Sequence, residues 1–215
     1  MNTLLDSLID QLDTLVPFLA LSREDVFQVL NDHRLTWFAT NEEALPEAYA
    51  AYRKQINHAA LLLGYSYFES FITDLLANVL RNRPLMLPRN KKVDYSEILD
   101  SPDIEALIDR LIQRELHDLH YKSMTDIITE LRRRYNFTIT QEEEHGLVVA
   151  SLIRNCIMHN SSCANSRLGS YDGYQESEEF ELSTEDVHEY GIMLRSLVRR
   201  MYAEACENHD VGGRT

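Results

Sequence analysis

The sequence predicts an all-α protein, and three observations lead to that class. The 215-residue chain contains only 7 Gly and 5 Pro, too few for the dense turns of an all-β fold. Apolar residues recur at helical spacing through most of the chain. Several apolar stretches follow a serine or threonine that has an acidic residue three positions later, the capping-box pattern of a helix start. We therefore expect one helical domain, or one domain with a small appendage.

The elements follow from these signals in chain order. Helices are predicted over residues 2–20, 47–81, 102–120 and 123–135, and Ser101 is the predicted N-cap of the helix over 102–120. Three more helices are predicted to begin at capping pairs: one at Ser22 with Asp25, one from Thr140 with Glu143 to about Asn160, and one from Ser183 with Asp186 to about Cys206. Residues 161–182 are predicted to form a short loop or hairpin before the last helix. We expect 1–44 to be an N-terminal helical extension, 45–206 the main domain and 207–215 a disordered tail.

The net charge of −14 argues against a protein that coats nucleic acid regardless of its sequence, since such proteins need a basic surface. An enzyme with a small positive cleft remains compatible with this charge. Residues 172–189 contain eight Asp or Glu and no Lys or Arg. We expect this acidic stretch to be a solvated loop; the alternatives are that it repels RNA or pairs with a basic partner.

The chain carries no predicted membrane span and no predicted secretion signal. Its best uncharged run, residues 59–68, is half the length that a membrane helix needs. The N-terminus lacks the basic region of a signal peptide and instead carries Asp6, Asp10 and Asp13. Three scattered cysteines do not make a disulfide framework. These features predict a cytoplasmic protein that makes no membrane contact.

Candidate catalytic residues occur together late in the chain, in the hexapeptide RNCIMH. It holds Arg154, Asn155 and His159 within one predicted helix. At 100° per residue, Arg154 and His159 lie about 140° apart around the helix axis, whereas Asn155 and His159 share a face. One helix therefore does not bring the arginine and the histidine together, and a second copy packed across a two-fold axis would help to complete the site.

These three residue types suit RNA cleavage without a metal. RNA can be cut by its own 2′-OH, a reaction that needs a proton-transfer group active near neutral pH, such as an imidazole. A fixed cation must also hold the phosphate, and a guanidinium does so with two hydrogen bonds. An amide can orient either group. Because the 2′-OH is the nucleophile, DNA would not be a substrate.

In these residues the sequence resembles the HEPN superfamily, the higher-eukaryote and prokaryote nucleotide-binding domains. RNCIMH matches the arginine, polar residue, three-residue spacer and histidine that the family carries late in an all-α domain, and the following Asn160 is also family-like. An earlier helix of the family carries an apolar run with a glutamate after an aromatic residue, as Glu69 does here. The capped last helix is similar too. The resemblance covers roughly residues 45–205, and only the hexapeptide is specific.

The resemblance implies an up-and-down helical bundle of HEPN type that acts as a metal-independent endoribonuclease. Family nucleases are usually homodimers whose two motifs meet at the interface, and many are toxins or anti-phage defence effectors held by a partner protein. By position, Arg154 would bind the scissile phosphate, His159 would transfer a proton and Asn155 would support both, while Asn160 and Glu69 would contact substrate. No cofactor is implied. A tyrosine that is modified in one subgroup is replaced here by Ser161.

Other residues permit rival interpretations. His117 and His120 share a helix face and could bind a metal, but we expect a surface role because no third ligand is evident. Cys156, His159 and Cys163 fit no common zinc spacing. As a carboxylate in an apolar helix, Glu69 is expected to pair with a core Arg or Lys, or else to lie near the active site.

The densest basic run is Arg132–Arg134, and Arg195, Arg199 and Arg200 are similar. We expect both groups to be solvated helix surface, with contact to RNA as the alternative. Two other functions stay open beside the nuclease. One is a non-catalytic interaction module of the same fold, because the acidic net charge would suit binding to a protein partner. The other is a metal enzyme that uses His117 and His120.

Overall fold

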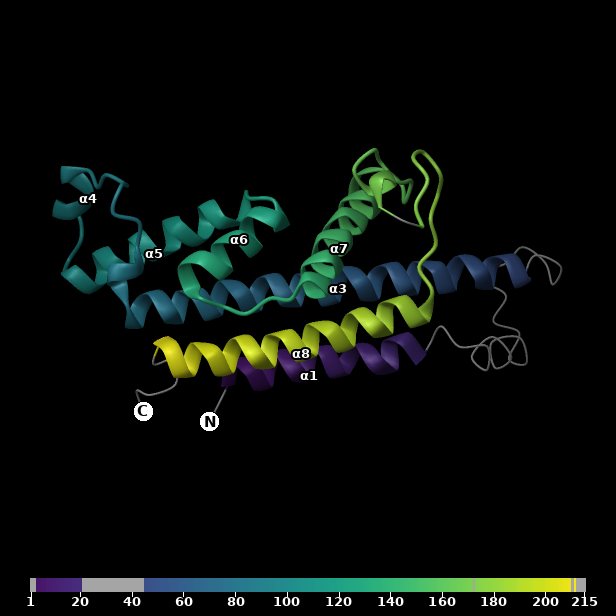
Figure 1. The fold of residues 1–215 in the computed structure, drawn as a ribbon, viewed down its shortest axis with the longest axis horizontal. Helices are drawn as coiled ribbons and strands as arrows, with labels where there is room; N and C mark the ends of the chain where they lie inside the picture. Colours follow the sequence, from purple (N-terminus) through teal and green to yellow (C-terminus); the bar gives the residue numbers. More distant parts are fainter. Residues whose placement is uncertain (1–2, 21–44, 172, 210, 212–215) are drawn as a thin grey trace.

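The computed structural model describes residues 3–20, 45–171, 173–209 and 211, and these form helices joined by irregular connections (Figure 1). No β-strand occurs in these ranges; the nearest feature is an isolated antiparallel bridge between Cys163 and Glu179. The all-α prediction is confirmed. The helix predicted to begin at Ser22 lies outside the described residues.

The long helix α3 (Leu45–Asn82) is the central element of the fold. Its 38 residues correspond to a length of about 57 Å at 1.5 Å per residue. Helices α1 (Thr3–Ala20) and α8 (Thr184–His209) pack against it and against each other (Figure 1). The side chains of α3 that face them and the other helices include fully buried Phe68, Phe71, Leu75 and Leu80, which explains why the middle of this helix is apolar nearly all round.

Three further helices cover another side of α3. They are α5 (Ile104–His120), α6 (Met124–Tyr135) and α7 (Gln141–His159), and α6 also contacts α7. In Figure 1 they lie above α3, while α1 and α8 lie below it. Short elements complete the fold: the 3-10 helices η3 (Pro84–Met86) and η4 (Leu168–Ser170), and the helix α4 (Tyr95–Leu99).

Capping residues fix where most of these helices begin. At the start of α7, the Thr140 amide donates to the Glu143 carboxylate (2.8 Å) and the Glu143 amide donates to the Thr140 hydroxyl (3.2 Å). Ser183 and Asp186 exchange the same two bonds at the start of α8. These two predicted capping boxes are confirmed; the third, Ser22 with Asp25, lies outside the described residues.

The start of α5 differs from the prediction. Ser101 does not cap this helix; its hydroxyl donates to the carbonyl of Glu97 (2.8 Å) at the end of α4. Asp103 is the N-cap instead, and its carboxylate accepts from the Ala106 amide (2.8 Å). The hydroxyl of Ser101 is thus bonded to a short helix that the sequence did not predict, and Asp103, two residues later, caps α5 instead.

The end of α8 also differs, since the helix reaches His209 rather than about Cys206. The imidazole of His209 is buried and donates from Nε2 to the carbonyl of Tyr135 (2.8 Å) on α6. Val211 is buried as well. Because these contacts join the end of α8 to the core, residues 207–209 belong to the packed helix.

The segment between α7 and α8 is anchored by a second, smaller hydrophobic cluster. Leu168 and Phe180 of this segment are buried with Ile153 and Cys156 of α7 and Leu61 of α3. Backbone hydrogen bonds near the Cys163–Glu179 bridge draw its two halves together, as when the Ala164 amide donates to the Glu178 carbonyl (2.9 Å). The predicted loop or hairpin is therefore a loop with one bridge, and it packs against the C-terminal half of α7.

Candidate functional site

The helix α7 carries the predicted motif and ends directly after it. His159 is its last residue and Asn160 is the C-cap. Ser161 and Ser162 follow with φ of 50° and 62°, in the left-handed region that ends a helix. The Asn160 side-chain amide donates to the Cys163 carbonyl (2.7 Å), so Asn160 holds the following turn together.

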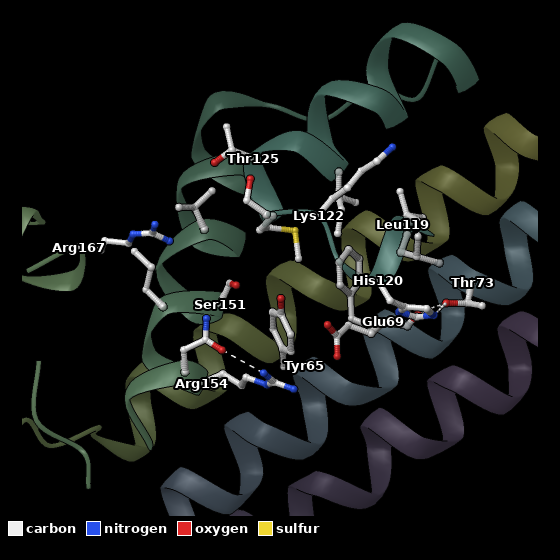
Figure 2. Close-up of a pocket in the computed structure, with 18 of the residues that line it drawn as sticks. Tyr65, Glu69, Thr73, Leu119, His120, Lys122, Thr125, Ser151, Arg154 and Arg167 are labelled. Atoms are coloured by element: carbon white, nitrogen blue, oxygen red, sulfur yellow. Dashed lines mark hydrogen bonds between the residues drawn. The ribbon is translucent and has the colours of Figure 1, made fainter. Parts of the chain in front are cut away.

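Arg154 and Asn155 lie together at the edge of a pocket of about 620 Å³. The Arg154 guanidinium donates from Nη1 to the side-chain oxygen of Asn155 (3.0 Å), and both residues are half-buried (Figure 2). A pocket of this size falls in the range that holds small ligands or a nucleotide-sized group. Arg154 and Asn155 are therefore in direct contact where they line the pocket.

His159 does not line this pocket. It is exposed, one helical turn beyond Asn155, which places it about 6 Å farther along the axis of α7. Asn160 is exposed as well and lies outside the pocket. The structure therefore groups Arg154 with Asn155 at the pocket. It separates Arg154 from His159, as the helical angle predicted, but Asn155, which was predicted to share a face with His159, lines the pocket without it.

The pocket walls come from α3, the end of α5, the start of α6, α7 and the segment around η4. Helix α3 supplies Tyr65 and Glu69, the end of α5 supplies His120, and α7 supplies Ser151 beside Arg154. The segment before and within η4 supplies further polar residues, among them an arginine (Figure 2). Burial raises the pKa of Tyr65 above its ordinary value, and the neighbouring Ser151 side chain offsets this only in part.

Positive charge is in excess in this pocket. Arg154, Arg167 and Lys122 line it, against the single carboxylate of Glu69. Lys122 forms an ion pair with Glu130, whereas Arg154 and Arg167 form none with the residues that the structure describes. In a chain of net charge −14, two arginines without an ion pair at one pocket favour an anionic ligand such as a phosphate.

Glu69 lies in this pocket rather than in a core ion pair. Its side chain is half-buried, and no described residue donates a hydrogen bond to its carboxylate. Burial raises the pKa of Glu69 above its ordinary value, and the positive charges of Arg154 and His120 offset this only in part. Of the two roles that the sequence left open for Glu69, its position matches the one near the candidate site.

His117 and His120 occupy different surroundings despite their shared helix. His120 lines the pocket, and its Nε2 lies 3.3 Å from the Thr73 hydroxyl on α3. The ring of His117 instead packs against Tyr121, with ring centroids 5.1 Å apart. Within the described residues, no group of three or more His, Cys, Asp or Glu side chains is arranged to hold a metal ion.

Sequence reasoning missed His120, Lys122 and Arg167 as pocket residues. His120 appeared only as half of a metal pair, and no local pattern connects it to α7. Arg167 lies in a loop whose path is fixed by the buried Leu168 next to it. The sequence holds only a weak signal for them: His120 and Arg167 both lie next to loops, where side chains commonly reach ligands.

The basic runs act mainly within the fold. Arg132 pairs with Glu144 (2.5 Å) and donates to the Ile139 carbonyl. Arg134 binds Glu115 (2.5 Å) and Glu130 (2.7 Å), and donates to the Met86 carbonyl. On α8, Arg195 pairs with Asp13 and Arg200 with Glu143. These four arginines are therefore ion-paired, which differs from the solvated surface that the sequence predicted; Arg133 and Arg199 are exposed.

Comparison of the chain with models of protein families, with curated proteins and with solved structures finds no match. A search of the described helices for one that combines the length and apolar character of a membrane span finds none.

Proposed function

We propose that the protein is a metal-independent endoribonuclease of HEPN type, in which Arg154 binds the scissile phosphate, Asn155 supports it and His159 transfers a proton. One observation carries this proposal: Arg154, held by Asn155, opens onto a pocket with excess positive charge in an otherwise acidic protein. An unpaired guanidinium in such a pocket is suited to a phosphate and stabilises the charge that develops on it during cleavage.

The proposed reaction uses the 2′-OH of the RNA. The 2′ oxygen attacks the neighbouring phosphorus, the bond to the 5′ oxygen breaks, and a 2′,3′-cyclic phosphate remains. One proton leaves the 2′-OH and one reaches the 5′ oxygen, so no metal or cofactor is required. His159 is exposed at the end of α7 and is accessible to RNA that extends from the pocket along this helix. The half-buried Glu69 and the exposed Asn160 are proposed to contact the strand.

We propose that two chains assemble this site as a homodimer. His159 lies outside the pocket that Arg154 lines, so a second copy packed along the end of α7 would bring one chain's histidine toward the other's arginine. Met158, next to His159, is 56% exposed and offers an apolar contact for such packing. We expect Met158→Glu to yield folded monomers that no longer cleave RNA, as gel filtration and cleavage of the same sample would show.

Cleavage of a mixed RNA panel in the presence of a chelator tests the proposed activity. We expect the wild type to leave 2′,3′-cyclic phosphate ends and to spare substrates with 2′-deoxy sugars. Arg154→Ala and His159→Ala should lose cleavage, while Arg133→Ala, an exposed arginine away from the pocket, should keep it. If all four proteins leave the RNA equally intact, the enzyme hypothesis fails; equal residual cleavage by all four would indicate a contaminant.

We further propose that this activity serves a bacterial toxin or anti-phage defence system in which a partner protein controls the nuclease. Induced expression of the wild type alone should then arrest growth, and His159→Ala should not. Equal growth with both proteins would remove the toxin role without removing the enzymatic one.

A non-catalytic interaction module is the second candidate. A specific observation favours it: the η3–α5 region exposes several large apolar side chains, namely Leu85 (84%), Tyr95 (83%), Leu99 (78%) and Ile104 (66%). Exposed apolar residues of this size are typical of contact surfaces. A stoichiometric protein partner, with no RNA cleavage even after the partner is removed, would favour this candidate over the nuclease.

A further inference from the structure

His120 is the one imidazole among the described residues that line the pocket of Arg154. It is the last residue of α5, and the packing of α5 on α3 places it beside Thr73. The charges of both His120 and Arg154 act on the Glu69 carboxylate, so the three side chains share one electrostatic environment. Figure 2 shows His120 and Glu69 close together, with Arg154 on the neighbouring wall of the pocket.

The contacts of Thr73 determine which nitrogen of His120 carries the proton in its neutral form. The single hydroxyl hydrogen of Thr73 is donated to the Glu69 carbonyl (2.8 Å). Its oxygen can therefore only accept from His120, whose Nε2 lies 3.3 Å away. Neutral His120 thus carries its hydrogen on Nε2 and keeps a free lone pair on Nδ1, which is the arrangement of a general base.

Cleavage through the 2′-OH requires two proton transfers, and the motif on α7 provides one histidine. The base must accept the 2′-OH proton as the new bond between oxygen and phosphorus forms. The acid must deliver a proton to the 5′ oxygen as its bond to phosphorus breaks. His159 lies outside the pocket of its own chain, and a partner's His159 brought to Arg154 would serve one of the two transfers. A residue of the pocket itself is therefore a candidate for the other.

We propose that His120 is this second group: with the phosphate held by Arg154, Nδ1 of His120 accepts the proton of the 2′-OH, and His159 of either protomer protonates the leaving 5′ oxygen. This inference rests on the proposed ribonuclease function and adds a catalytic residue from α5 to the motif on α7. The negative charge of Glu69 stabilises the imidazolium that forms on His120. Arg154, Arg167 and Lys122 are the positive groups that line the same pocket.

The neighbouring histidine on α5 provides a matched control. His117 lies one turn before His120, is exposed and does not line the pocket. We expect His120→Ala to lower kcat for RNA by about 10²–10⁴-fold, the usual contribution of a general base, with KM unchanged. His117→Ala should behave as the wild type. His120→Gln, which keeps the polar contact with Thr73, should lose the same activity, and thermal unfolding of each variant checks that it is folded.

A substrate with an aryl leaving group separates the base from the acid. A ribonucleoside 3′-(p-nitrophenyl) phosphate releases nitrophenolate, which needs no protonation. On this substrate His159→Ala should recover most of its rate, whereas His120→Ala should stay impaired. The pH profile of kcat/KM on the same substrate should lose its acidic limb in His120→Ala, because that limb reports the base.

The outcomes distinguish this inference from the function on which it rests. If the wild type cleaves neither substrate, the proposed function fails and this inference fails with it. If the wild type cleaves both and His120→Ala matches His117→Ala, only the role of His120 is overturned. If His120→Ala is impaired on RNA but recovers on the aryl substrate, His120 is not the base.

Discussion

Two regions of this protein place an arginine near a partly or fully buried glutamate, and they treat the charges in opposite ways. In the Arg134 cluster (Lys91, Glu115, Glu130 and Arg134), Glu115 accepts hydrogen bonds from Lys91 (2.7 Å) and Arg134 (2.5 Å). In the pocket of Arg154, the Glu69 carboxylate accepts none from the described residues. The first region uses its charges to join α5 and α6, and the second leaves them available to a ligand.

The pKa directions express the same difference. Burial alone would raise the pKa of Glu115, but the hydrogen bonds from Lys91 and Arg134 outweigh it and lower that pKa below its ordinary value. Burial raises the pKa of Glu69, and the more distant charges of Arg154 and His120 do not compensate. A pocket carboxylate whose pKa is raised in this way is a candidate for a functional residue.

The same substitution in each region gives the largest expected effect. Arg134→Met removes the guanidinium and leaves Glu115 and Glu130, whose side chains are 8% and 14% exposed, with one cation each, Lys91 and Lys122. We expect the free energy of unfolding to fall by about 3–5 kcal/mol, the usual result of breaking a buried ion pair. Urea denaturation measures this change, and cleavage per folded molecule should be unaffected.

Arg154→Met should reverse this pattern. Because Arg154 forms no ion pair with the described residues, its loss should leave the free energy of unfolding unchanged. Cleavage should fall by about 10²–10³-fold, or about 2.7–4 kcal/mol of transition-state stabilisation. Denaturation and RNA cleavage assays on one preparation test both halves. A large loss of stability with normal cleavage would mean that Arg154, like Arg134, stabilises the fold and does not act in cleavage.

Replacement of each glutamate by glutamine should change stability in opposite directions. A raised pKa in the folded state means that ionised Glu69 lowers stability, so the stabilising, protonated form is lost as pH rises through the folded pKa. Glu69→Gln should therefore raise the unfolding temperature at neutral pH, and this gain should disappear at pH values below the ordinary range of a glutamate.

Glu115→Gln should lower the unfolding temperature at neutral pH. The lowered pKa of Glu115 means that its stabilising contribution is present above the unfolded pKa and is lost as pH falls through the folded pKa. Thermal unfolding of both glutamine variants across pH measures the two trends. Parallel trends would show that the two regions are electrostatically alike.

The smallest effect is expected at an exposed ion pair between an arginine and a carboxylate. Arg81 and Asp109 form a 2.9 Å contact with side chains 47% and 54% exposed. Arg81→Ala should change the free energy of unfolding by about 1 kcal/mol or less, because solvent screens such pairs. Denaturation in low and high salt checks this, and a loss as large as that of Arg134→Met would mean that burial is not what distinguishes the two regions.

Local signals predicted the helices well where capping residues act over three positions. Thr140 with Glu143 and Ser183 with Asp186 each cap the helix that they were predicted to open. The predicted N-cap of α5 was wrong because Ser101 is hydrogen-bonded to α4, a helix that no capping box in the sequence predicted. The end of α8 was placed early because a contact with α6, and not a local stop signal, holds His209.

The sequence by itself determined the helical class, the motif of Arg154, Asn155 and His159 on one helix, and the angle that separates its arginine from its histidine, since 3.6-residue periodicity fixes these within α7. Only the tertiary structure decided which charges are paired. Glu69 and Glu115 each lie in an amphipathic or apolar helix, and nothing local distinguishes them. The packing of α3, α5, α6 and α7 supplies Glu115 with two cations and places Glu69 beside His120 at an open pocket. Such contacts depend on how the helices pack against one another, which no local sequence signal records.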